Sequence, residues 1–192
     1  GFSGLSRQKL LSILTARAEE LGVELTFGRE VTSLDAFEDE DLVVLSDGAN
    51  SAHRAQLAEH FEPSVDWRPN RFVWLGTTKA FKAFTFYFND TPHGLFQVHA
   101  YRYEEGCSTF IVECTEETFA KAGLENATED ETIRFCEEVF KAELGGHKLL
   151  KNRSIWRQFP TIKNARSHHG KVVLLGDAAH TAHFSIGSGT KL

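Results

Sequence analysis

The sequence is poor in sulfur, with no methionine and only three cysteines among 192 residues. Cys107, Cys114 and Cys136 are widely spaced, which excludes a disulfide framework and a CxxC site and favours a reducing, cytoplasmic setting. No uninterrupted apolar run approaches the roughly 20 residues of a membrane-spanning helix, so we expect no membrane partner. Basic residues number 21 against 27 acidic ones, and the net charge of −6 argues against a general nucleic-acid binder.

Aromatic residues, in contrast, are plentiful, with 16 Phe, 3 Trp and 3 Tyr. This much apolar surface excludes disorder as the main state of the chain. The chain begins at Gly1 without an initiator methionine, and its last residues indicate a helix that has just begun. We therefore expect it to be part of a longer protein.

Hydrophobic periodicity and turn residues predict an alternation of helices and strands. An apolar stripe predicts a helix from Ser6 to about Leu21, and a capping box of Thr128 with Glu131 begins a second helix that runs to Leu144. The short apolar runs at 42–45 and 171–175 are typical of strands buried on both faces. Further strands are predicted at 23–27, 72–78, 83–89, 94–103, 108–114 and 149–159.

The order of these elements predicts a mixed α/β (α+β) chain. The middle strands follow one another closely without helices between them, which indicates an antiparallel meander. Two α/β pieces therefore flank a β-rich, antiparallel sheet with helices.

The first chemical motif follows the predicted strand near the C-terminus, in the string GDAAHTAHFSIGSG. Asp177 would lie at the carboxyl end of that strand, where open α/β sheets bind ligands. Gly187 and Gly189 would bring bare backbone N–H groups to the start of a helix, which favours negative charge. This arrangement suits a nucleotide cofactor. Alternatively, Asp177 is a simple cap of a strand-turn-helix.

A second motif, DLVVLSDGANSAHR, repeats the pattern of a strand that ends in an acidic turn. Here the turn is Asp47-Gly48, and Ser51 and Arg54 follow within reach of a phosphate or of Asp47 itself. A plain turn followed by a surface arginine explains the same residues, and the sequence leaves both interpretations open.

These two strings resemble the paired "DG" and "GD" fingerprints of FAD-dependent aromatic hydroxylases of the p-hydroxybenzoate hydroxylase type. The opening helix, with Arg7, Leu10 and Leu14, resembles the R-x-x-L-x-x-x-L helix of that family. The stretches NRFVWLGT, GLFQVHAYRY, STFIVECTEET and GDAAHTAHFSIGSGTKL resemble in particular the flavin monooxygenase domains that act on aryl-CoA thioesters such as salicylyl-CoA or anthraniloyl-CoA.

The resemblance implies an FAD-dependent aromatic-ring monooxygenase that uses NAD(P)H and oxygen. It implies partial pieces of a Rossmann-like FAD-binding domain at 1–60 and 161–192, and a substrate-binding, β-rich domain at 61–160. Asp177 would bind the ribityl chain, and Asp47 would border the pyrophosphate region. The full set of implied cofactor-binding residues is Arg7, Asp47, Gly48, Gly176, Asp177, His180, Gly187 and Gly189.

The chain departs from the family at several places, among them the following two. It has no G-x-G-x-x-G motif, which in the family holds the FAD pyrophosphate, so the missing remainder of the parent chain would supply it. His183-Phe184 stands where the family commonly has two prolines.

Candidate substrate residues lie in the β-rich part. Gln97, His99 and Tyr101 alternate on one face of a predicted strand, and Trp74 lies on another strand. In this family the β-rich domain covers the substrate, so these residues would line an aromatic pocket. His99 is the candidate acid or base for a phenol near neutral pH. A solvated cross-strand face explains the same alternation, and Phe84, Phe86 and Phe88 are predicted to be core.

Several histidines near the C-terminus invite a metal interpretation, but no familiar ligand spacing accompanies them, and we expect no metal. Two alternatives to the monooxygenase remain: another FAD-dependent oxidoreductase or halogenase of the same fold, or a non-catalytic substrate-domain fragment. An unpaired sheet edge would favour association of two copies, so a homodimer is one expected assembly.

Overall fold

The computed structural model describes residues 4–182, which divide into two compact units. One unit comprises the described residues 4–25 and 69–158, and the other comprises 26–68 and 159–182. These borders fall near the expected ones at 60 and 160, but the N-terminal helix groups with the β-rich unit. The assignment of FAD-binding and substrate-binding domains stays a prediction.

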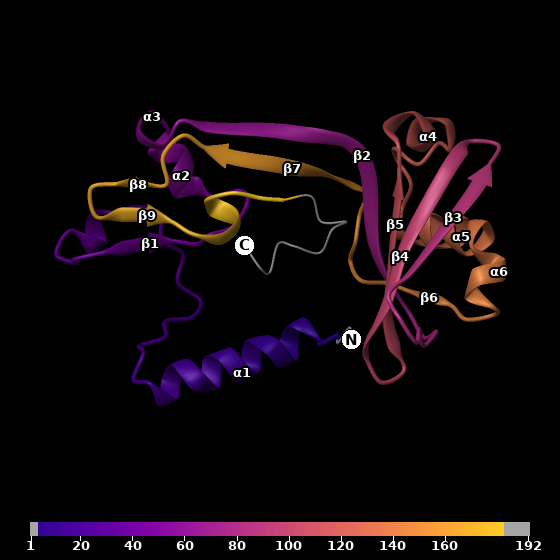
Figure 1. Cartoon of the computed structure of the whole chain (residues 1–192), viewed down its shortest axis with the longest axis horizontal. Helices are drawn as coiled ribbons and strands as arrows, with labels where there is room; N and C mark the ends of the chain where they lie inside the picture. The colour runs from indigo at the N-terminus through magenta and orange to yellow at the C-terminus, as the bar shows by residue number, and fades with distance from the viewer. Residues whose placement is uncertain (1–3, 183–192) are drawn as a thin grey trace. The chain divides into compact units, whose positions relative to one another are not determined.

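The β-rich unit contains most of a six-stranded sheet, of which strands β2 and β7 continue into the other unit (Figure 1). Its strands run in the order β3-β4-β5-β2-β6, and β7 also pairs with β2. Three consecutive strands form an antiparallel meander as predicted, but the prediction is wrong for 72–78, because β2 pairs antiparallel with β5 and not with its neighbour in sequence, β3. The bounds are β2 Pro63–Thr77, β3 Thr85–Thr91, β4 Gly94–Glu104, β5 Cys107–Cys114, β6 Leu149–Leu150 and β7 Arg157–Asn164.

Helices α5 (Glu129–Val139) and α6 (Lys141–Leu144) cover one face of this sheet, with α4 (Glu116–Lys121) near its end (Figure 1). The predicted capping box of Thr128 and Glu131 is confirmed. The helix is interrupted at Phe140, whose fully buried ring packs in the core, so the expected single helix is two. Alternate strand residues meet these helices in one apolar cluster, which includes Val73, Leu75, Phe96, Val98, Phe110 and Val112.

The second unit contains a small sheet in the order β1-β9-β8. Strands β1 (Val43–Leu45) and β9 (Val172–Leu174) are parallel, and β8 (His168–His169) is antiparallel to β9. Leu45, Phe61 and Leu174 form its core. The predicted burial of 42–45 on both faces is wrong, because Val44 is 46% exposed. The other elements are the 3-10 helices η1 (Asp35–Phe37) and η2 (Gly176–Ala178) and the helices α2 (Ala52–Gln56) and α3 (Ala58–Phe61).

Helix α1 (Arg7–Glu20) begins as predicted, with the Ser6 hydroxyl accepting a hydrogen bond from the Lys9 N–H. None of its residues is buried, however, so its apolar stripe lacks the expected packing within the described chain. The predicted strand at 23–27 is wrong, because that segment has no described strand partner to complete a ladder.

The predicted strand at 149–159 is also wrong in its middle and its end. Residues 151–156 are irregular between β6 and β7, and Pro160 lies inside β7 instead of ending a strand. Proline lacks only the N–H donor, so a strand accepts it where no ladder bond from that position is needed. No helix among residues 4–182 is long and apolar enough to cross a membrane.

Candidate cofactor loops and substrate face

The two acidic motifs follow neighbouring parallel strands in the second unit. Strand β1 pairs in register with β9, from Val43 opposite Val172 to Leu45 opposite Leu174. The Leu175 N–H extends the ladder by donating to the Leu45 carbonyl over 2.9 Å. Because the strands are parallel, both motifs leave the same edge of the sheet. This edge is where open α/β sheets bind ligands.

Asp47 lies in the loop after β1, with its carboxylate 3.2 Å from Nδ1 of His53. Burial acts to raise the pKa of Asp47, but hydrogen bonds from Ser51 and His53 outweigh it and hold the pKa below its ordinary value. Gly48 follows with φ of 87°, a conformation that strains any residue with a side chain. The loop therefore presents an ionised carboxylate at a tightly turned backbone.

Arg54 is not the surface arginine of the simpler interpretation, because it is only 6% exposed. Its Nη1 donates to the Ala178 carbonyl over 3.0 Å, and its Nη2 donates to the Ala49 carbonyl over 2.6 Å. The side chain thus joins the DG loop to the turn that follows β9. Sequence analysis placed Arg54 near a phosphate or Asp47 and missed this bond, which spans 124 residues.

His53 was missed by the sequence analysis altogether. Its side chain is 8% exposed, and its Nε2 is buried without a hydrogen-bond partner in the described structure. A histidine six residues after an aspartate is unremarkable in a sequence. Only the helix α2, which turns back after Ser51 caps it, brings the imidazole onto the Asp47 carboxylate.

The GD turn is open on its outer side. Asp177 lies in η2 with an exposed carboxylate, His180 is exposed, and Gly176 has φ of 60°. Thr181 fixes the following chain, since its hydroxyl accepts from the Ile162 N–H and donates to the Pro160 carbonyl.

The described structure does not test three of the predicted cofactor residues at this edge. Gly187 and Gly189 lie outside the described residues. Arg7 is the exposed first residue of α1, which belongs to the other compact unit.

All four predicted substrate residues share one face of the large sheet, opposite the face that packs against α5 and α6. One row crosses four strands, with Trp74 beside Ile111, Ile111 beside His99, and His99 beside Phe86. Gln97 and Tyr101 lie two residues to either side of His99 on the same strand. We call this surface the aromatic face, and define it by Phe72, Trp74, Phe84, Phe86, Phe88, Gln97, His99, Tyr101, Thr109, Ile111 and Glu113.

The prediction that Phe84, Phe86 and Phe88 form core is wrong for the last two. Phe86 is 48% exposed and Phe88 is 60% exposed, because β3 is the sheet edge and its outer face carries no described cover. Phe86 meets His99 edge-on at 4.8 Å between ring centres, and Phe84 stacks on Tyr101 at 5.2 Å. The rings thus surround a histidine that is itself buried.

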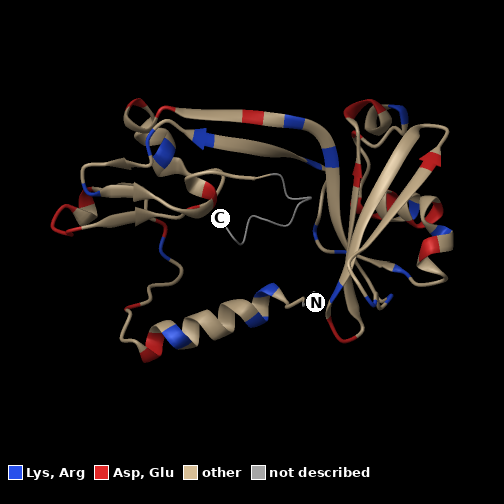
Figure 2. Cartoon of the chain, viewed as in Figure 1, with Lys and Arg blue, Asp and Glu red and all other residues tan. Residues whose placement is uncertain are grey.

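Glu113 is a second residue that the sequence analysis missed. It is 2% exposed, and its two oxygens accept from Nδ2 of Asn70 over 2.8 Å and from Nε2 of Gln97 over 2.7 Å. The Nε2 atom of His99 lies 3.9 Å from the same carboxylate. Strand β5 otherwise contains no charged residue, and Figure 2 shows its single acidic band.

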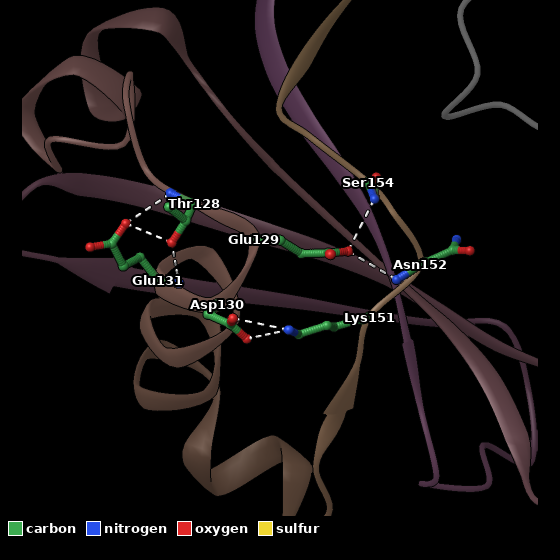
Figure 3. Close-up of polar contacts among 7 residues, drawn as sticks. All are labelled: Thr128, Glu129, Asp130, Glu131, Lys151, Asn152 and Ser154. Carbon is green, nitrogen blue, oxygen red and sulfur yellow. Dashed lines mark hydrogen bonds and ion pairs between the residues drawn. The ribbon is translucent and has the colours of Figure 1, made fainter.

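The backbone of Trp74 is anchored from outside its own strand. Its N–H donates to Oγ of Ser154 over 3.1 Å. Figure 3 shows how Ser154 is held in turn: the Glu129 carboxylate accepts from the backbone N–H groups of Asn152 and Ser154, both over 3.1 Å. Glu129, at the start of α5, therefore holds the segment 152–154, and Ser154 of that segment holds the backbone of Trp74.

Comparison with known proteins agrees with this arrangement. No protein-family model matches the chain. A 2-methyl-3-hydroxypyridine-5-carboxylic acid oxygenase structure superposes with a TM-score of 0.72 over 96% of this chain and 53% of that one, at 18% identity, which shows the fold. The described part of this chain therefore has the fold of about half of that oxygenase.

The sequence is similar to named enzymes over nearly its whole length. It is 42% identical to salicyloyl-CoA 5-hydroxylase of Streptomyces sp, over 100% of this chain and 39% of that protein. It is 40% identical to protodeoxyviolaceinate monooxygenase of Chromobacterium violaceum, over 98% of this chain and 51% of that protein. The chain thus spans 39% and 51% of the length of these two relatives.

The residues at the β1–β9 edge fit the FAD that the sequence resemblance predicts. The exposed Asp177 carboxylate accepts hydrogen bonds only, as the hydroxyls of a ribityl chain require. A Cβ atom added at Gly48 or Gly176 would meet nothing within 4 Å, so the backbone is open to a ligand at both turns. The orphaned Nε2 of His53 is a further buried polar atom beside the same loop.

Proposed function

We propose that the protein carrying this chain is an FAD-dependent monooxygenase that hydroxylates an aromatic ring presented as an aryl-CoA thioester, with NAD(P)H and oxygen as co-substrates. The observation that carries the proposal is the 42% identity to salicyloyl-CoA 5-hydroxylase along the entire chain. The parallel acidic loops and the aromatic face support it, since they offer acidic groups at one edge of a sheet and a surface lined by rings.

Each part of the chain has a proposed task. Asp177 would bind the ribityl hydroxyls, and Asp47 with Gly48 would border the dinucleotide, while Arg54 keeps the two loops in register. Bound FAD would supply the redox chemistry of oxygen transfer. The rings of Trp74 and Phe86 would stack on the substrate and exclude water from it.

His99 is proposed as the residue that moves a proton at a ring substituent. Imidazole changes charge near neutral pH, and this one lies among Phe86, Phe84 and the Glu113 carboxylate. As a base on a phenolic hydroxyl it would raise the electron density of the ring, which favours attack by an electrophilic oxygen.

The deciding experiment is a turnover assay on the full-length protein. With FAD, NAD(P)H and salicyloyl-CoA, we expect substrate-dependent NAD(P)H oxidation and a product heavier by one oxygen atom. Asp177→Ala should weaken FAD binding, and His99→Gln should lower hydroxylation while FAD stays bound. A full-length protein that binds no flavin would refute the proposal.

A further inference from the structure

The stability of the fold does not by itself explain why the carboxylate of Glu113 is buried. A charge in the interior is costly unless every oxygen is hydrogen-bonded, and a β-branched residue would fill a central strand position without that cost. Glu113 nevertheless engages Asn70 and Gln97 from the neighbouring strands. The cluster lies on the aromatic face, away from the helix-covered core.

The carboxylate fixes the orientation of its partners. An ionised carboxylate only accepts hydrogen bonds, so Asn70 and Gln97 must turn their NH2 groups toward it. The amide of Gln97 is then locked with its Oε1 atom directed away from Glu113. Gln97 can therefore offer its Oε1 acceptor to a ligand on this face, beside the second N–H of its amide.

The described residues around the Oε1 acceptor of Gln97 include the negative charge of Glu113 but no positively charged lysine or arginine. Two rows cross the face, Phe72–Glu113–Gln97–Phe88 and Trp74–Ile111–His99–Phe86, and neither contains Lys or Arg. Glu113 adds a negative charge to a surface of aromatic and apolar groups. Such a surface attracts a neutral ring that carries a hydrogen-bond donor, and it repels a ring with a free carboxylate.

We propose that Glu113 is a positioning residue that sets the ligand specificity of the aromatic face, by locking Gln97 as an acceptor for a ring hydroxyl or amino group and by repelling ring carboxylates. This inference rests on the proposed function, because it takes the aromatic face as the substrate surface. It adds that the aromatic face selects a ring that carries a hydrogen-bond donor and whose carboxyl group is uncharged, as it is in a thioester.

Three small probes separate the two effects on the full-length protein. Salicylamide and benzamide differ by one hydroxyl group, and salicylamide and salicylate differ in the charge of the carbonyl group. Dissociation constants measured by NMR titration should show salicylamide bound about tenfold more tightly than benzamide, the worth of one hydrogen bond. Salicylate should be the weakest of the three.

Two variants test the role of Glu113 itself. Glu113→Gln should bring the salicylamide-to-benzamide ratio toward one and strengthen salicylate binding several-fold. Gln97→Met should abolish the hydroxyl preference but keep the discrimination against salicylate, because the charge remains. Glu116→Gln is the matched control, since that carboxylate pairs with Arg71 on the other side of the sheet and should leave both ratios unchanged.

The outcomes also separate this inference from the proposed function. Flavin-dependent hydroxylation with unaltered ratios in folded Glu113→Gln and Gln97→Met would overturn the positioning role alone. Altered ratios in a protein that performs no hydroxylation would support the positioning role and refute the proposed reaction. Failure of all three probes to bind the wild-type protein would overturn the inference outright.

Discussion

Arg54 donates a hydrogen bond from Nη1 to the carbonyl oxygen of Ala178, 3.0 Å away, and this bond connects two motifs that lie 124 residues apart in the chain. The same guanidinium also binds the Ala49 carbonyl. A planar group with five donors satisfies two carbonyls at once, which a lysine ammonium does with poorer geometry. The two acidic loops therefore depend on one buried side chain for their spacing.

Arg54→Ala should lower the free energy of unfolding by about 2–3 kcal/mol, because the Ala178 and Ala49 carbonyls both lose a bond from a buried, charged donor. Urea denaturation measures the change. Arg29→Ala, at an exposed position, is the control and should stay within about 0.5 kcal/mol of wild type. Equal effects of the two substitutions would show that the Arg54 bonds add nothing to stability.

Asp47 should give stability a specific dependence on pH. Its pKa lies below the ordinary value of 3.8, so its hydrogen bonds stabilise the fold fully above that value. Their contribution is lost as the pH falls below 3.8 through the folded pKa. Urea midpoints measured from pH 6 to pH 2.5 should fall less steeply in Asp47→Asn than in wild type. Asp41→Asn, at an exposed site, should retain the wild-type slope.

Glu129 should control the order of the segment beside Trp74. Glu129→Ala removes the acceptor of two backbone N–H groups, and should cost about 1 kcal/mol of local stability. Hydrogen exchange at the Asn152 and Ser154 amides should then be about fivefold faster. Asp130→Ala loses only an exposed pair with Lys151, so unchanged exchange at both amides is expected there (Figure 3).

The three cysteines should differ sharply in reactivity. Burial raises the pKa of Cys114 to about 12 and also raises that of Cys136, whereas Cys107 is half-buried. At pH 8 a thiol with that pKa is about one part in ten thousand thiolate. A thiol-reactive dye should therefore label one site quickly in the native protein and three after unfolding. Fast labelling of Cys136 in the native state would contradict the packing of α5.

Local pattern was sufficient where one segment's own chemistry decides its structure. The capping box at Thr128, the cap at Ser6, the meander strands and the acidic turns after β1 and β9 were all predicted, because each depends on neighbouring residues. The predicted strand at 23–27 failed for the opposite reason. Its alternation is genuine, but a strand needs a partner for its hydrogen bonds, and the described chain supplies none.

The candidate site residues show the same difference between what a local pattern predicts and what contacts between distant segments decide. Alternation along β4 was enough to predict that Gln97, His99 and Tyr101 share a face. It gave no sign of Glu113, because the buried carboxylate is explained only by amides from two other strands. The burial of Arg54 was equally hidden, since its acceptor at Ala178 is distant in sequence.

The sequence by itself determined the order of elements, the two acidic motifs and the resemblance to aromatic hydroxylases, because these are properties of short stretches of chain. The tertiary structure alone decided which side chains from different strands share a surface. Strand register placed His99 beside Phe86 and Ile111, and the parallel pairing of β1 with β9 brought both acidic loops to one edge. Such pairings depend on contacts between segments that are distant in the sequence, and no local pattern of residues predicts which of these segments will pair.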